Sequence, residues 1–245
     1  MPPADEDVAY LLDALNAFFG TSLAPEDLTG AYAGVRPLIS TADPKKSVDI
    51  SRRAELYETS SGLVTITGGK LTTWRRMAKS AVDRIVEREG REAPCRTHEI
   101  PLGLPLDPAE LSEHTTVDAE SRAHLAARYG HAAQFVLRLV EAAPQLGQRI
   151  SPELPDIVAE APFAAAHEQA RSLGDVLLRR TRLGLLDARA LTAPGAERPC
   201  VVAEAMAPEL GWDAAGVARQ LDDWRELARA EGLVAPEPAA TGAAA

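Results

Sequence analysis

LVTITGGKLTTWRR, at residues 63–76, is the stretch of this 245-residue chain that decides its local fold. Residues 63–67 alternate apolar and hydroxyl side chains, most of them β-branched, which predicts a strand. Gly68 and Gly69 then permit a sharp turn. After the turn the apolar side chains recur with helical spacing, at Leu71, Trp74, Ala78, Ala81, Val82 and Ile85. The stretch therefore predicts a strand, a glycine turn and a helix that ends near residue 89, with Gly90 as its stop.

The glycine turn is also a candidate binding site. A helix that starts directly after such a turn presents unpaired N–H groups and a partial positive charge, and Lys70 adds a full charge there. An anion or an electron-rich ring would suit this place. Most strand–turn–helix junctions bind nothing, however, and this one lacks the spacing of a Walker P-loop. The turn by itself is a weak indication.

Several segments, in the same order, resemble the flavin-dependent glycerol-3-phosphate dehydrogenases. They are DVAYLLDALN at 7–16, AGVRPLI at 33–39, Ser51-Arg52, LVTITGGKLTT at 63–73 and DVLLRRTRLG at 175–184. The last of these resembles the hallmark of that family's C-terminal helical domain. The resemblance covers nearly the whole chain.

In that family a Gly-x-Gly-x-x-Gly turn near the N-terminus holds the FAD pyrophosphate, and this sequence has no such pattern. The resemblance therefore implies the C-terminal portion of a longer flavoprotein. We expect an α+β fold: a small partial β-sheet with a helix, left from the substrate domain, and then an all-α C-terminal domain. The expected boundaries are 1–90 for the FAD/substrate-binding part, 91–107 for a linker, 108–232 for the helical domain and 233–245 for a disordered tail.

The apolar periodicity and the breaker residues predict the remaining elements. Strands are expected at 31–39 and 52–58. Ser172 and Asp175 have the spacing of a capping box, and the three tryptophans, Trp74, Trp212 and Trp224, are expected to pack in cores. Helices are expected at 5–19, 108–113, 118–129, 131–142, 155–170, 172–186, 199–207 and 213–231.

The resemblance assigns substrate binding to Arg36, Arg52 and Lys70. Arg36 would hold the substrate oxygens, since a planar guanidinium suits bidentate oxygen recognition, and Arg52 would clamp the phosphate. Arg53 points to the opposite face of a strand from Arg52, so only one of the two can serve. No residue qualifies as the general base, so the catalytic residue is unknown.

The resemblance places the cofactor at the glycine turn. The N–H groups of Leu71 and Thr72 would face the flavin oxygen at C2, and the hydroxyls of Thr72 and Thr73 could instead serve as helix caps. The cofactor-binding residues implied are Gly68, Gly69, Lys70, Leu71 and Thr72.

The resemblance further implies FAD as cofactor, oxidation of sn-glycerol 3-phosphate to dihydroxyacetone phosphate, and quinone as the electron acceptor. The partner would be the N-terminal FAD-binding half. The protein would lie in the cytoplasm or, as a peripheral protein, at the inner face of the cell membrane. The resemblance leaves open whether the protein forms a homodimer and whether it contacts the membrane peripherally. It also leaves open a related oxidase that passes its electrons to oxygen. So does a different class of protein, a non-catalytic truncated remnant or helical interaction module.

The composition argues against several other classes of protein and kinds of site. The formal net charge of −10 argues against a nucleic-acid binder, which needs a basic face. The five histidines are scattered, and Cys95 and Cys200 lack ligand spacing, so we expect no metal site and two reduced thiols. The acidic N-terminus predicts no signal peptide, and no apolar run has the roughly 18 residues that would span a membrane.

Overall fold

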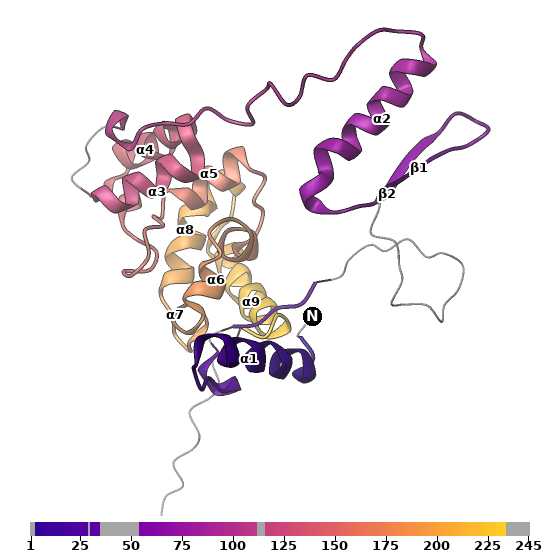
Figure 1. Ribbon diagram of the computed structural model, residues 1–245. Coiled ribbons are helices and arrows are strands. Elements are labelled where there is room, and N and C mark those ends of the chain that lie inside the picture. The colour runs from indigo at the N-terminus through magenta and orange to yellow at the C-terminus, as the bar shows by residue number, and fades with distance from the viewer. Residues whose placement is uncertain (1–2, 29, 35–53, 112–115, 234–245) are drawn as a thin grey trace, which may run out of the picture. The chain divides into compact units, whose positions relative to one another are not determined.

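The computed structural model describes residues 3–28, 30–34, 54–111 and 116–233. Contacts divide the chain into two units: a helical unit of residues 1–34 and 103–245, and a hairpin unit of residues 35–102. A small antiparallel sheet lies in the hairpin unit, and helices dominate the rest (Figure 1). The expected α+β class is therefore confirmed. The predicted domain boundaries at 90, 107 and 232 stay a prediction.

The hairpin unit is a β-hairpin followed by a helix. Strands β1 (Ala54–Glu58) and β2 (Val64–Gly68) pair antiparallel, with Leu56 opposite Ile66. A short 3₁₀ turn, η3 (Leu71–Thr73), leads directly into α2 (Trp74–Arg88), which packs on both strands. The predicted strand at 63–67 and the helix up to residue 89 are confirmed to within a few residues.

Helix α2 does not bury its apolar stripe. It meets the hairpin with Met77, Arg84 and Arg88: Arg84 Nε donates to Glu58 at 2.7 Å, and Arg88 Nη1 to the Gly62 carbonyl at 2.6 Å. None of the residues from 54 to 102 is buried. The expectation that Trp74 packs in a core is wrong, because its side chain is 47% exposed.

The helical unit contains the remaining elements. The predicted helix at 155–170 begins only at residue 160, and the one at 172–186 is split at Arg182, which has a left-handed φ of 61°. Residues 31–34 of the predicted strand at 31–39 form no strand, and residues 35–39 lie outside the described part. The α-helices are α1 (Asp5–Phe19), α3 (Ala119–Tyr129), α4 (Ala133–Ala142), α5 (Glu160–His167), α6 (Leu183–Leu186), α7 (Ala188–Thr192), α8 (Arg198–Leu210) and α9 (Ala214–Ala230), with a π-helix at Asp175–Arg180 and short 3₁₀ turns at Pro25–Asp27, Pro108–Glu110, Gly130–Ala132 and Pro144–Gly147.

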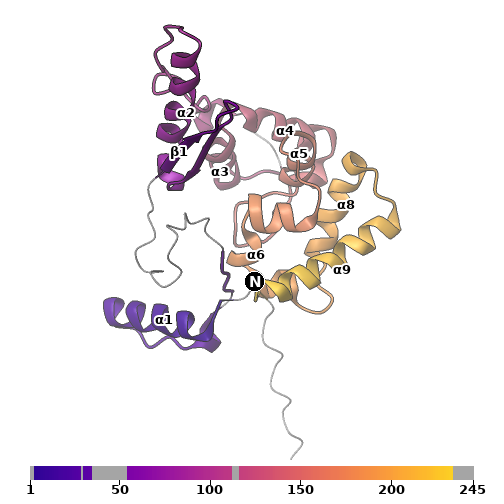
Figure 2. The ribbon, with the colours of Figure 1, turned by 90° about the vertical axis from the view of Figure 1, so that its right-hand side faces the viewer.

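Two hydrophobic clusters form the interior of the helical unit. One gathers around Leu177 and Trp224, and the other around Leu125 and Val136. Helix α5 packs against α8, and α8 against α9 (Figure 2). The predicted capping box is confirmed: the Asp175 carboxylate accepts the N–H of Ser172 at 3.0 Å, and the Ser172 hydroxyl accepts the N–H of Asp175 at 3.2 Å.

None of the helices in the described residues combines the length and the apolar character that a bilayer crossing needs. This agrees with the expectation from hydropathy, within those residues.

Asp118 caps the start of α3 and binds Arg149. Hydrogen bonds from Arg149, and next the N–H of Ser121, lower the pKa of Asp118 to about 2. Because the folded-state pKa lies below the unfolded value, the stability that the carboxylate contributes is present above about pH 4 and is lost as the pH falls toward about 2.

We expect Asp118→Asn, which keeps a capping oxygen, to flatten the dependence of the urea midpoint on pH across this acid range. Urea unfolding at a series of pH values measures it. Parallel curves for the variant and the wild type would contradict the assignment.

Candidate functional site

The predicted cofactor turn follows β2. Gly68 and Gly69 have φ values of 73° and 76°, in the left-handed region that favours glycine. A Cβ at Gly69 would lie 2.4 Å from the Met77 sulfur of α2. The backbone conformation and this close approach of the helix therefore both require glycine at position 69.

Hydrogen bonds tie the end of the turn to the helix. The Thr73 hydroxyl accepts the N–H of Lys70 at 3.2 Å and donates to the Lys70 carbonyl at 2.9 Å. Thr73 is therefore a cap, as in the alternative reading of its hydroxyl. Among the described residues, no acceptor binds the N–H groups of Leu71 and Thr72, and the Lys70 side chain is exposed. These groups can receive an anionic or carbonyl oxygen.

The structure describes only part of the predicted site. Gly68, Gly69, Lys70, Leu71 and Thr72 follow one another in the turn. The other two predicted residues, Arg36 and Arg52, lie outside the described residues. The substrate and cofactor roles of all seven residues therefore stay predictions.

Gly69→Ala should destabilise the hairpin unit by about 1–3 kcal/mol, because the new Cβ meets the Met77 sulfur and the left-handed backbone becomes strained. Thermal unfolding followed by far-UV circular dichroism measures the loss. Gly90→Ala is the matched control, since Gly90 also has a positive φ, of 61°, but a Cβ there would meet nothing within 4 Å. Equal losses in both variants would mean that the Met77 contact adds nothing.

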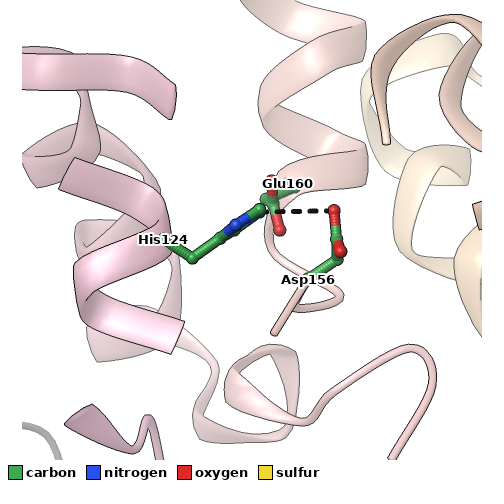
Figure 3. A group of neighbouring side chains, drawn as sticks. All are labelled: His124, Asp156 and Glu160. Atoms are coloured by element: carbon green, nitrogen blue, oxygen red, sulfur yellow. Dashed lines mark ion pairs between the residues drawn. The ribbon is translucent and has the colours of Figure 1, made fainter. Parts of the chain in front are cut away.

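A second group of charged side chains lies in the helical unit (Figure 3). His124 comes from α3, Glu160 from the start of α5 and Asp156 from the loop before it. One imidazole nitrogen of His124 and one carboxylate oxygen each of Asp156 and Glu160 lie within 4.8 Å of one another. The guanidinium of Arg128 binds Asp156 Oδ1 and lies 2.7 Å from Glu160 Oε1, so it supplies the positive charge between the two carboxylates. We call these four residues the Arg128 cluster and read it as a buried ion-pair network.

The carboxylates of the Arg128 cluster are held by further donors. Tyr129 donates its hydroxyl to Glu160 Oε1 at 3.0 Å, and the N–H of Ile157 donates to Glu160 Oε2 at 2.8 Å. Burial raises the pKa of Glu160 even though Arg128 opposes the shift. Burial also acts to raise the pKa of Asp156, but His124 and Arg128 together outweigh it and the pKa is lowered.

The Arg128 cluster was not predicted from the sequence. His124 and Arg128 are four residues apart, and so are Asp156 and Glu160, a spacing that brings side chains together on a helix. This spacing was the available signal. It could not show that the two pairs meet, because about thirty residues separate them in the chain.

This chain is similar to known proteins. The family model described as the C-terminal domain of alpha-glycerophosphate oxidase matches residues 95–217. Glycerol-3-phosphate dehydrogenase 1 of Mycobacterium tuberculosis is 37% identical over 193 residues, which cover 75% of this chain and 36% of the relative. Glycerol-3-phosphate dehydrogenase 2 of the same organism is 34% identical over 240 residues, covering 95% of this chain and 40% of the relative.

A probable mitochondrial glycerol-3-phosphate dehydrogenase of Caenorhabditis elegans is 32% identical over 240 residues, which cover 91% of this chain and 32% of the relative. The chain thus spans about a third to two fifths of the length of these relatives. The order of its segments, the helical unit and these matches lead to one conclusion: the chain belongs to the glycerol-3-phosphate oxidase and dehydrogenase family and corresponds to its C-terminal part.

Proposed function

We propose that this chain supplies the C-terminal part of an FAD-dependent dehydrogenase that oxidises sn-glycerol 3-phosphate to dihydroxyacetone phosphate. The observation that carries the proposal is the 34% identity with glycerol-3-phosphate dehydrogenase 2 of Mycobacterium tuberculosis over 95% of this chain, a span that includes the glycine turn. Quinone as electron acceptor, a place in the cytoplasm or at the inner face of the membrane, and a homodimer are finer parts of the same proposal.

The glycine turn fits one edge of a flavin. Its two N–H groups without an acceptor among the described residues, at Leu71 and Thr72, suit the oxygen at flavin C2. Bound FAD would accept the hydride. Lys70 would add positive charge beside the ring, and Arg36 and Arg52 would hold the substrate's phosphate and hydroxyl oxygens. Gly68 and Gly69 would let the backbone approach the cofactor closely.

The hairpin unit also presents surface for a protein partner. Leu71 is 88% exposed, and Trp74, Val82 and Ile85 continue the uncovered apolar stripe along α2. In the described residues each strand of the hairpin has one unpaired edge. A two-stranded sheet is marginal by itself, and contiguous apolar patches mark interaction surfaces. We assign this surface to the N-terminal FAD-binding half of the enzyme.

Reconstitution tests the proposal. The purified chain would be titrated with FAD, alone and together with the separately expressed N-terminal half of a full-length relative. We expect uptake of flavin, and dye reduction by glycerol 3-phosphate, only in the mixture. In that mixture Lys70→Met should lower turnover about tenfold or more, whereas Lys79→Met, which removes an exposed lysine paired with Asp83, should leave it unchanged.

A non-catalytic helical interaction module is the second candidate. Both hydrophobic clusters lie wholly in the helical unit, so this unit has a core that does not depend on a flavin. No flavin uptake and no turnover in the mixture, from a chain that circular dichroism shows to be folded, would favour this candidate over the dehydrogenase.

A further inference from the structure

The Arg128 cluster has an unbalanced charge. Asp156 and Glu160 are 2% and 1% exposed, and among the described residues Arg128 is the one permanent cation bonded to them. The fourth member, His124, has a buried Nε2 without a hydrogen-bond partner, 3.4 Å from Asp156 Oδ1. In the imidazolium form of His124 this nitrogen would be a donor for Asp156, and the ring would supply the second positive charge. Without it, a net negative charge stays buried, which is costly.

The Arg128 cluster lies where the two hydrophobic clusters meet. Val158, Ala161 and Ala164 belong to the cluster around Trp224, whereas Ile157 and Phe163 belong to the cluster around Leu125. The start of α5 therefore contacts both interiors of the helical unit. His124 reaches this place from α3 (Figure 3), and Arg128 belongs to the same helix. These ion pairs, together with the ring contact between Tyr129 and Phe163 at 5.2 Å, link α3 to the start of α5.

We propose that the Arg128 cluster is a proton-responsive latch between α3 and α5, closed when His124 carries a proton and loosened when the proton leaves. Imidazole is the side chain that changes charge between about pH 5 and 8. The proposal concerns the helical unit and is independent of the flavin site.

The other charged groups at the latch are already paired. From α3, Tyr129 donates to Glu160, which also receives the N–H of Ile157 and the guanidinium of Arg128. Arg128 and the N–H of Ile157 oppose the effect of burial on Glu160, but the pKa of Glu160 remains raised. Glu168, which acts electrostatically on Tyr129, forms an ion pair with Arg180. His124 differs from the other members because its buried Nε2 has no hydrogen-bond partner, and its contact with Asp156 changes when the ring becomes an imidazolium.

Hydrogen exchange tests the latch on the full chain. Amide protection in residues 124–129 and 157–164 would be measured by mass spectrometry at about pH 5.5 and about pH 8, each corrected for the intrinsic exchange rate. Between these conditions we expect the wild type to lose about tenfold more protection than His124→Gln. Glutamine can donate to Asp156 but does not titrate.

Two further variants make the test specific. His131→Gln, which removes an exposed histidine at the start of the next helical segment, should behave as the wild type. Asp156→Asn, which removes the charge that faces His124, should abolish the extra loss. The same loss in the wild type and in His124→Gln, or a loosening at the acid end, would overturn the proposal.

Discussion

Replacing Arg128 with methionine should destabilise the helical unit by about 3–5 kcal/mol, the largest loss expected of any ion-pair substitution in the chain. Methionine fills a similar volume but leaves Asp156 and Glu160 buried without the guanidinium that binds both. Removing one partner of a buried pair is costly because the remaining charge is uncompensated. Urea unfolding at neutral pH, followed by far-UV circular dichroism, measures the loss.

Two comparisons separate charge from packing in this prediction. Arg138→Met removes an exposed arginine that stacks over the Phe135 ring at 4.8 Å, and should cost less than about 1 kcal/mol. Adding Asp156→Asn and Glu160→Gln to Arg128→Met removes the stranded charges, so the triple variant should be more stable than Arg128→Met alone. A triple variant less stable than the single one would show that lost packing, not charge, dominates.

Trp224→Ala should cost the helical unit about 3–5 kcal/mol. The indole is 2% exposed, and its Nε1 donates to the Leu191 carbonyl at 2.9 Å. A Cβ at Gly184 would lie 2.9 Å from Trp224 Cη2, so the ring packs directly on the backbone at Gly184. Alanine would leave a cavity between α6, α7 and α9 and an unpaired buried carbonyl. The same urea experiment measures the loss.

Two other aromatic substitutions calibrate this result. Trp224→Phe keeps most of the packing but loses the hydrogen bond to Leu191, so a loss of about 1–3 kcal/mol is expected. Trp74→Ala removes an indole that is half exposed in α2, and its effect on the unfolding of the isolated chain should be below about 1 kcal/mol. A loss at Trp74 as large as at Trp224 would mean that α2 is covered in solution, for instance by a second copy of the chain.

Local pattern was sufficient wherever a segment's own side chains decide its backbone. The alternation at 63–67, the paired glycines and the 3.6-residue spacing after residue 71 predicted the strand, the turn and the helix of the hairpin unit. Ser172 and Asp175 close their capping box through neighbouring atoms, so their spacing predicted it as well. Where the backbone leaves ideal geometry the pattern failed: α5 starts late, and Arg182 divides the predicted helix at 172–186.

By itself, the sequence determined the fold class, most helices and the family of this protein, because those depend on short-range periodicity and on motifs that lie in one segment. Tertiary structure alone decided which faces are covered. Periodicity shows that α2 has an apolar stripe, but only the packed hairpin shows that Met77 and two arginines meet the hairpin while Trp74 is 47% exposed. The tertiary structure also brought His124 and Arg128 to Asp156 and Glu160. Such a meeting depends on how α3 and α5 pack, and packing follows from the summed burial of many side chains rather than from any one motif.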